Sequence, residues 1–186
     1  MELTRTLVSE AAAEYDEREP FVPVEVENVE TLPEAFREGE FGFRDAEWVV
    51  QWFYRRPTGE YSNREIRQRE GAFAANERQE VRRAVTDAAT GGTLAERIDR
   101  LCELEGVALP VASAFLFFSD TERYIVVGPR EWGTLHAAGE VEGGYPNPPT
   151  LAEYERYLER CRSLGERFDC DMWTLYRGLW RLGSED

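Results

Sequence analysis

Three capping boxes constrain the fold of this chain more than any other sequence feature. Each is a serine or threonine followed three residues later by a glutamate, directly before apolar residues at helical spacing. The hydroxyl can accept a hydrogen bond from the glutamate N–H, and the carboxylate can accept one from the N–H of the hydroxyl residue, which starts a helix. The pairs are Ser62 with Glu65, Thr93 with Glu96 and Thr150 with Glu153. They favour an all-α fold.

Helical periodicity extends over most of the chain. Expected helices cover residues 2–15, 63–70, 94–104 and 110–118, and others begin near Asp45, Asn76, Leu151 and Asp171. The helix from Asp45 should end at Pro57 and Gly59. Trp48 and Trp52 lie four residues apart on it, so they share a face that should be buried. The last helix is apolar over much of its circumference, which predicts that it is wedged between other helices.

One segment departs from this helical pattern. Residues 20–36, PFVPVEVENVETLPEAF, are acidic and interrupted by prolines, which disfavour a helix interior. Val22, Val24 and Val26 alternate with other residues, as in a short extended segment. We therefore expect a connector here.

The length of the chain limits its domain organisation. With 186 residues it can bury a core but is short for two average domains. We expect a single domain over 1–186, divided at most into an N-terminal helical lobe (1–92) and a second lobe (93–186). The chain starts without a basic segment followed by an apolar run, and eighteen consecutive apolar residues occur nowhere. These features predict a cytoplasmic protein with no membrane partner.

The charged residues are unusual in kind. All 22 basic side chains are arginine, and 37 acids give a net charge of −15. Without lysine, Schiff-base chemistry on a lysine amine is excluded. Such acidity keeps proteins soluble in a concentrated-salt cytosol, so we expect a haloarchaeal source. An acidic protein of an ordinary cytosol is the alternative.

The charge is also unevenly distributed. Residues 1–47 contain fourteen acids and four arginines, whereas residues 55–83 contain eight arginines and five glutamates. If the protein binds nucleic acid, the second segment is the expected contact. A solvated helical face with Glu–Arg pairs is the other interpretation of the same segment.

Cysteine and histidine are too few for common metal sites. Cys102, Cys161 and Cys170 contain no CxxC pair, so we expect reduced, mostly buried thiols and neither zinc nor an iron–sulfur cluster. His136 is the only histidine and has no nucleophile partner in the sequence, which disfavours a catalytic triad. We expect it at the surface or in a loop, and we expect no cofactor.

A compact pair of helices is predicted around Gly106. The first helix ends near Leu104, residues 105–109 form a tight turn, and Pro110 occupies the first position of the next helix, where no N–H is needed. Gly106 can adopt a positive φ where the chain reverses. The free N–H groups at the start of the second helix could meet a DNA phosphate.

This stretch resembles a known motif. Its pattern L-x-G-V-x-x-x-x-A-S-A is similar to the helix-hairpin-helix of the HhH-GPD DNA glycosylase superfamily, and the resemblance extends over residues 93–182. The matching residues are Leu104, Gly106, Val107, Ala112, Ser113 and Ala114. The resemblance implies a DNA-glycosylase-like helical domain, here with an acidic N-terminal extension and a link to DNA repair. It also implies a phosphate-binding hairpin made by Gly106, Val107, Ala108 and Pro110.

Departures from the family pattern concern its chemistry. The second hairpin glycine of the family is Ala108 here, the nucleophilic lysine of bifunctional members is Pro110, and the catalytic aspartate falls at Gly128. We therefore expect a divergent, non-catalytic member that binds DNA or a nucleotide. The expected nucleic-acid face comprises Arg55, Arg56, Arg64, Arg67, Arg123 and Arg130.

Two other functions fit the same residues. The chain could be a helical interaction module that lost DNA binding, with a basic protein partner docked on its N-terminal acids. It could also be a monofunctional DNA glycosylase that uses Asp120 as a non-standard carboxylate. Glu131 is expected to face solvent. Trp132 could stack on a base, although tryptophan in such a protein is usually core.

Overall fold

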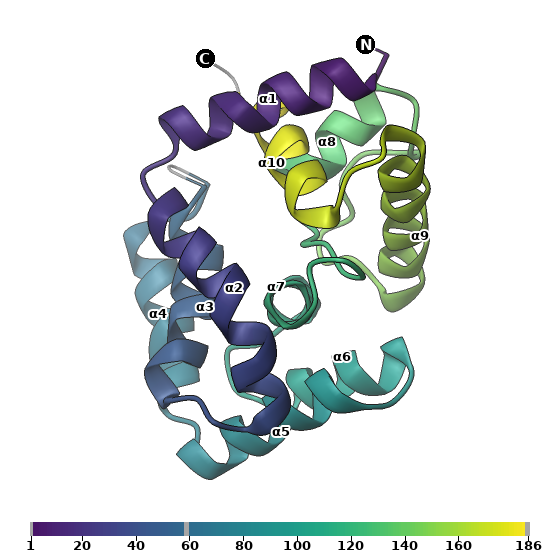
Figure 1. Ribbon diagram of the computed structural model, residues 1–186. Coiled ribbons are helices and arrows are strands. Elements are labelled where there is room, and N and C mark those ends of the chain that lie inside the picture. The colour runs from purple at the N-terminus through teal and green to yellow at the C-terminus, as the bar shows by residue number, and fades with distance from the viewer. Residues whose placement is uncertain (1, 58–59, 185–186) are drawn as a thin grey trace. The chain divides into compact units, whose positions relative to one another are not determined.

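The computed structural model describes residues 2–57 and 60–184 (Figure 1). Within these two stretches the chain forms ten helices and no β-strand, which confirms the all-α prediction. The predicted helices are present with shifted ends, and Gly59, expected to end the third helix, lies outside the described residues. The helices are α1 (Arg5–Arg18), α2 (Val22–Glu38), α3 (Phe43–Arg55), α4 (Asn63–Ala74), α5 (Arg78–Thr90), α6 (Leu94–Cys102), α7 (Leu109–Ser119), α8 (Pro129–Ala137), α9 (Leu151–Phe168) and α10 (Met172–Leu182).

The chain divides into two compact units. Residues 24–120 form a central unit, and residues 1–23 together with 121–186 form a terminal unit. The divisions therefore fall after Pro23 and after Asp120, whereas the sequence suggests one after residue 92. As a consequence, α6 and α7 belong to the same unit as α3, α4 and α5.

All three capping boxes are confirmed. The hydroxyls of Ser62, Thr93 and Thr150 accept hydrogen bonds from the glutamate N–H groups at 3.2, 3.3 and 3.3 Å. The carboxylates accept the reciprocal bonds from the hydroxyl residues' N–H groups at 2.9, 2.7 and 2.7 Å. These bonds stabilise the charged form, so they lower the pKa of each glutamate.

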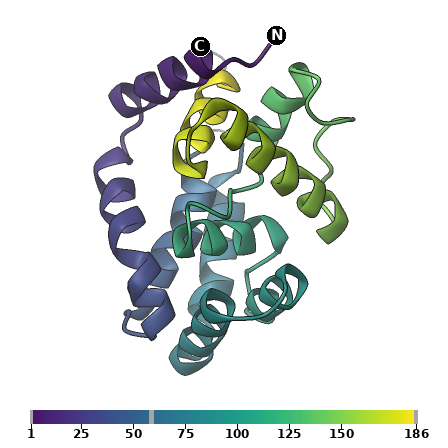
Figure 2. The ribbon, with the colours of Figure 1, turned by 45° about the vertical axis from the view of Figure 1, so that its right-hand side comes forward.

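Helix α7 forms the core of the central unit. Its residues 111–119 are all buried, and it contacts α3, α5 and α6 (Figure 2). The Trp52 ring on α3 meets the Phe118 ring edge-on at 4.8 Å between centroids. Trp52 is buried and Trp48 half-buried, so the expected burial of their shared face is confirmed.

The predicted connector is wrong, because residues 22–38 form helix α2. Its buried residues, Glu25, Leu32 and Phe36, lie seven and four residues apart, which is a helical spacing. The Phe36 ring packs against Phe41 and Phe115, and this burial outweighs the missing N–H of the prolines. The alternating valines do not mark a strand, since Val24 and Val26 are exposed.

Helix α10 forms the core of the terminal unit. It contacts α1, α8 and α9, which confirms that it is wedged between other helices (Figure 1). Gly178 permits the close approach to α1, because a Cβ there would lie 2.8 Å from the Val8 carbonyl oxygen.

Residues 124–127 form a buried segment of the terminal unit without regular secondary structure. Two tyrosines of α9 hold it through hydrogen bonds to its backbone. The Tyr154 hydroxyl donates to the Ile125 carbonyl at 3.0 Å, and the Tyr157 hydroxyl donates to the Val126 carbonyl at 2.8 Å. Across the described parts of the chain, every helix is too short or too polar to cross a bilayer.

Candidate functional site

The predicted reversal at Gly106 is confirmed. Gly106 has φ +82°, and the Val107 N–H donates to the Leu104 carbonyl at 3.1 Å. The side chains of Leu104 and Val107 are buried beneath the turn. Helix α7 begins at Leu109, so Pro110 occupies the second helical position rather than the first.

The hairpin, defined as residues 105–110, rests on helix α4. A Cβ at Gly106 would lie 2.8 Å from both the Arg69 carbonyl oxygen and the Phe73 nitrogen. Because no side chain fits this gap, the glycine is required for packing as well as for its positive φ.

Asn76, in the turn between α4 and α5, fastens the hairpin in place. Its Nδ2 donates to the Glu105 carbonyl at 3.0 Å and to the Phe73 carbonyl at 2.8 Å. Its Oδ1 accepts from the Glu105 N–H at 2.9 Å. The hairpin is therefore held by side-chain and backbone contacts to one neighbouring helical turn.

The first turn of α7 presents free backbone donors. Ala108 is the N-cap residue, is exposed and has no side-chain oxygen to cap the helix. The N–H groups of Ala108, Leu109 and Val111 have no acceptor within residues 2–57 and 60–184. Such a terminus favours anions through its N–H groups and the helix dipole.

Exposed arginines lie on both helices that flank the turn at Asn76. Helices α4 and α5 meet at Asn76, and both carry exposed arginines along their length. Those on α4 are Arg64, Arg67 and Arg69, and those on α5 are Arg78, Arg82 and Arg83. Two predicted features that are far apart in sequence, the hairpin and the arginine-rich segment, are thus neighbours.

Arg55 and Arg56 differ from these arginines because each is held by a neighbouring side chain. Arg55 makes a bidentate contact with Glu70 at 2.6 and 2.7 Å, and this hydrogen bonding raises the pKa of its guanidinium. Arg56 is only 5% exposed and lies over the Trp52 ring at 4.1 Å. The prediction that Arg56 faces nucleic acid is therefore wrong, because the cation is packed on an aromatic ring.

The remaining predicted contacts belong to the terminal unit. Arg123 is exposed, while Arg130 lies over the Trp180 ring at 4.3 Å. Trp132 is 5% exposed and stacks on Tyr157 with 5.7 Å between ring centroids, so it packs in the core instead of offering a face to a base.

The two candidate carboxylates have different surroundings. Glu131 was expected to face solvent, but it is completely buried, because the first turn of α8 points it toward Tyr157 and Cys161. Asp120 is half-buried and ends α7, with its N–H donating to the Leu116 carbonyl at 3.0 Å.

The thiols are free, as expected, but only Cys161 is buried. Cys102 is exposed and Cys170 half-buried, so the expectation of mostly buried thiols is wrong. Desolvation of the sulfur, with a smaller contribution from Asp99, raises the pKa of Cys102 to about 11. His136 is exposed, as predicted. No cluster of potential metal ligands occurs among the residues that the structure describes.

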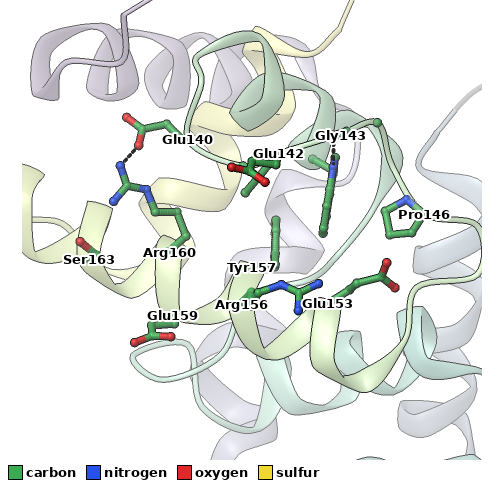
Figure 3. Close-up of a pocket in the computed structure, with 13 residues that line it drawn as sticks. Glu140, Glu142, Gly143, Pro146, Glu153, Arg156, Tyr157, Glu159, Arg160 and Ser163 are labelled. Atoms are coloured by element: carbon green, nitrogen blue, oxygen red, sulfur yellow. Dashed lines mark hydrogen bonds and ion pairs between the residues drawn. The ribbon is translucent and has the colours of Figure 1, made fainter.

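A cavity of about 690 Å³ in the terminal unit was not foreseen from the sequence (Figure 3). It lies between α9 and the loop that joins α8 to α9, and Trp132 and Tyr157 contribute to its lining. Two sequence signals relate to it: a long Gly/Pro-rich loop, and polar α9 residues at helical spacing, Glu153, Arg156, Arg160 and Ser163.

Neither the protein-family models, nor the curated proteins, nor the solved structures give a match to this chain.

Proposed function

We propose that the hairpin, together with the exposed arginines of α4 and α5, binds the phosphate backbone of nucleic acid without catalysing base excision. The observation that carries this proposal is the close packing of Gly106 against the backbone of Arg69 and Phe73 in α4. It brings the hairpin, which leads into the free donors at the start of α7, against the backbone of α4, a helix of the same unit that carries exposed arginines.

Both kinds of group suit a phosphate. The N–H groups at the start of α7 can donate to phosphate oxygens, and the dipole of the helix favours negative charge there. Arginine adds bidentate, charge-assisted hydrogen bonds. Contacts of this type fix the position of a nucleic acid but carry no sequence information, so we expect binding with little sequence preference.

The absence of excision chemistry follows from two residues. Pro110 and Gly128 stand where the resemblance to glycosylases would require a lysine and an aspartate. Neither residue can attack a sugar or activate a water molecule. The proposed activity is therefore binding alone.

Salt should affect this binding in two opposing ways. The net charge of −15 and the hairpin residue Glu105 repel a polyanion at low salt. In roughly molar salt the Debye length is about 3 Å, so distant acids no longer oppose the local contacts. Counterion release then contributes less as well, and direct hydrogen bonds must supply the affinity.

The variant Ala108→Asp tests the hairpin most directly. An aspartate at this N-cap should accept a hydrogen bond from the Val111 N–H and raise the free energy of unfolding by about 1 kcal/mol. The same carboxylate would occupy the phosphate donors and repel the ligand. We expect affinity for labelled single-stranded and duplex DNA, measured by fluorescence anisotropy from physiological to molar potassium chloride, to fall at least about tenfold.

Matched variants separate this effect from a general charge effect. Ala152→Asp adds an exposed carboxylate to the first turn of α9 in the terminal unit and should leave DNA affinity unchanged. Arg64→Gln and Arg67→Gln should each reduce the salt slope of binding by about 1. Undiminished binding by Ala108→Asp would remove the hairpin from the site, and no binding by the wild-type protein at any salt would overturn the proposal.

A second candidate function, docking of a basic protein, is favoured by the surface of α2. Val24 and Val26 are the exposed large hydrophobic residues of the described chain, and exposed acids, including Glu27, Glu30 and Glu34, lie on the same helix. A partner captured by the wild-type chain at high salt, and lost on Val24→Asp with Val26→Asp, would support this function.

A further inference from the structure

The cavity in the terminal unit has the size of a small-molecule site. Its volume of about 690 Å³ falls within the range of roughly 300–1,000 Å³ that is typical of ligand pockets. One wall is the face of α9 that carries Arg156 and Arg160, and the other is the loop from Glu140 to Pro146 (Figure 3).

The loop wall is fixed at several points. Glu140 accepts hydrogen bonds from Arg160 and, at 2.8 Å, from Arg167. The Trp132 indole N–H donates to the Gly143 carbonyl at 3.0 Å. The loop ends at Thr150, in the capping box of α9. The cavity is therefore preformed, so a ligand would not have to order the loop on binding.

The charges that line the cavity are only partly neutralised. Arg160 is committed to Glu140, and the Glu153 carboxylate accepts two hydrogen bonds from Thr150. Glu142, Glu159 and Arg156 make no salt bridge or hydrogen bond within the described residues, although the charge of Arg156 lies close enough to help lower the pKa of Glu153. Figure 3 shows Glu142 on the loop side and Arg156 on the α9 side, with Tyr157 between them.

The balance of these charges indicates the charge of a complementary ligand. The four lining glutamates exceed the two lining arginines by two charges, and Arg167, which pairs with Glu140, reduces the excess to one. A complementary ligand therefore has one surplus positive charge. It also needs an anionic group for Arg156 and two cationic groups for Glu142 and Glu159.

We propose that this cavity binds a basic α-amino acid, such as arginine or lysine. Its carboxylate meets Arg156, its two cationic groups meet Glu142 and Glu159, and its aliphatic stem lies along the apolar parts of the lining, such as Val141 and Pro146. A simple anion does not fit, because the two uncompensated glutamates repel it.

Calorimetric titration with free L-arginine and L-lysine tests the proposal. It is done at about 0.1 M and about 1 M potassium chloride, where the Debye length is about 10 Å and about 3 Å. We expect saturable binding, with L-norleucine, which lacks the side-chain cation, and L-arginine methyl ester, which lacks the carboxylate, each weaker by about tenfold or more. Arg156→Gln should weaken L-arginine by a similar factor and abolish its advantage over the methyl ester. One of the two variants Glu142→Gln and Glu159→Gln should abolish the preference for L-arginine over L-norleucine, and that variant identifies the carboxylate that meets the side-chain cation.

Two controls distinguish specific binding from other effects. Glu155→Gln removes an exposed charge of α9 outside the cavity and should bind as the wild-type protein does. Ala108→Asp, in the central unit, should also retain amino-acid binding, so a failure of this proposal is separable from a failure of the DNA site. Far-UV circular dichroism checks that each variant is folded.

Three results would overturn the proposal. They are no saturable binding of either basic amino acid at either salt concentration, equal binding of L-arginine and its methyl ester by the wild-type protein, and binding of a basic polypeptide without binding of the free amino acid. The last result would assign the cavity to a protein partner instead.

Discussion

Asn76 and Glu105 exchange two hydrogen bonds across a separation of 29 residues, and these bonds join the hairpin to the turn between α4 and α5. The side-chain amide of Asn76 matches both groups of the Glu105 peptide, a donor and an acceptor. Its amide oxygen accepts one bond and its amide nitrogen donates the other, so a single planar group satisfies both. The position of the hairpin therefore depends on one amide.

Replacement of this amide should loosen the hairpin. We expect Asn76→Ala to lower the free energy of unfolding by about 1–3 kcal/mol, since it removes both bonds to Glu105 and one to the Phe73 carbonyl. Asn76→Asp keeps only the acceptor, so its free energy of unfolding should lie between those of the wild-type protein and Asn76→Ala. Urea denaturation measures the change, and a loss below about 0.5 kcal/mol for Asn76→Ala would contradict it.

Gly106→Ala should be more damaging than the addition of one methyl group suggests. Gly106 has a positive φ, and the added Cβ would lie 2.8 Å from two backbone atoms of α4, which cannot move without shifting the helix. We expect a loss of about 2–4 kcal/mol in the free energy of unfolding. Thermal unfolding of both the variant and the wild-type protein measures it.

Gly71→Ala is the matched control for that variant. Gly71 lies on α4 in the same unit, and a Cβ there would meet nothing within 4 Å. Alanine favours a helix interior, so this change should raise stability by about 0.5–1 kcal/mol. If Gly106→Ala and Gly71→Ala lose similar amounts of stability, the packing of Gly106 on α4 is unimportant.

Stability should fall at alkaline pH because of Tyr154 and Tyr157. Burial is the main cause that raises the pKa of both hydroxyls above the ordinary value of 10.0. The unfolded chain ionises near the ordinary value while the folded chain does not, so stability is intact below pH 10 and decreases as the pH rises above it. Absorbance at 295 nm should show these two tyrosines ionising only together with loss of helical circular dichroism.

The same tyrosines can be tested one at a time. Tyr154→Phe and Tyr157→Phe each leave a buried carbonyl, that of Ile125 or Val126, without its donor. We expect a cost of about 1–3 kcal/mol at neutral pH for each variant. Ionisation of either hydroxyl in the folded state, before unfolding, would contradict the assigned burial.

Cys102 should react slowly in spite of its exposed position. With a pKa of about 11 instead of 9.0, its thiolate population near pH 8 is lower by about two orders of magnitude, and the thiolate is the nucleophile. Alkylation by iodoacetamide, followed by mass spectrometry of peptides, should be about tenfold slower than in the urea-unfolded chain, because the more basic thiolate is also more nucleophilic and offsets part of the loss. Equal rates in the two states would refute the raised pKa.

Local sequence alone determined where most helices begin and where the hairpin turns. The capping boxes at Ser62, Thr93 and Thr150 act within four residues, and the positive φ of Gly106 is a property of one residue. Such short-range interactions do not depend on the rest of the fold. For that reason the all-α class and the hairpin were predictable.

Only the tertiary structure decided which faces are buried and what lies beside the hairpin. Residues 22–38 became a helix because Leu32 and Phe36 are buried, against the local signal of the prolines. Glu131 and Arg56 were removed from solvent by neighbouring aromatic residues, and the cavity exists because a loop is fastened to α9 by Glu140. The physical reason is that burial depends on partners distant in sequence, whereas capping and turn geometry depend on neighbours.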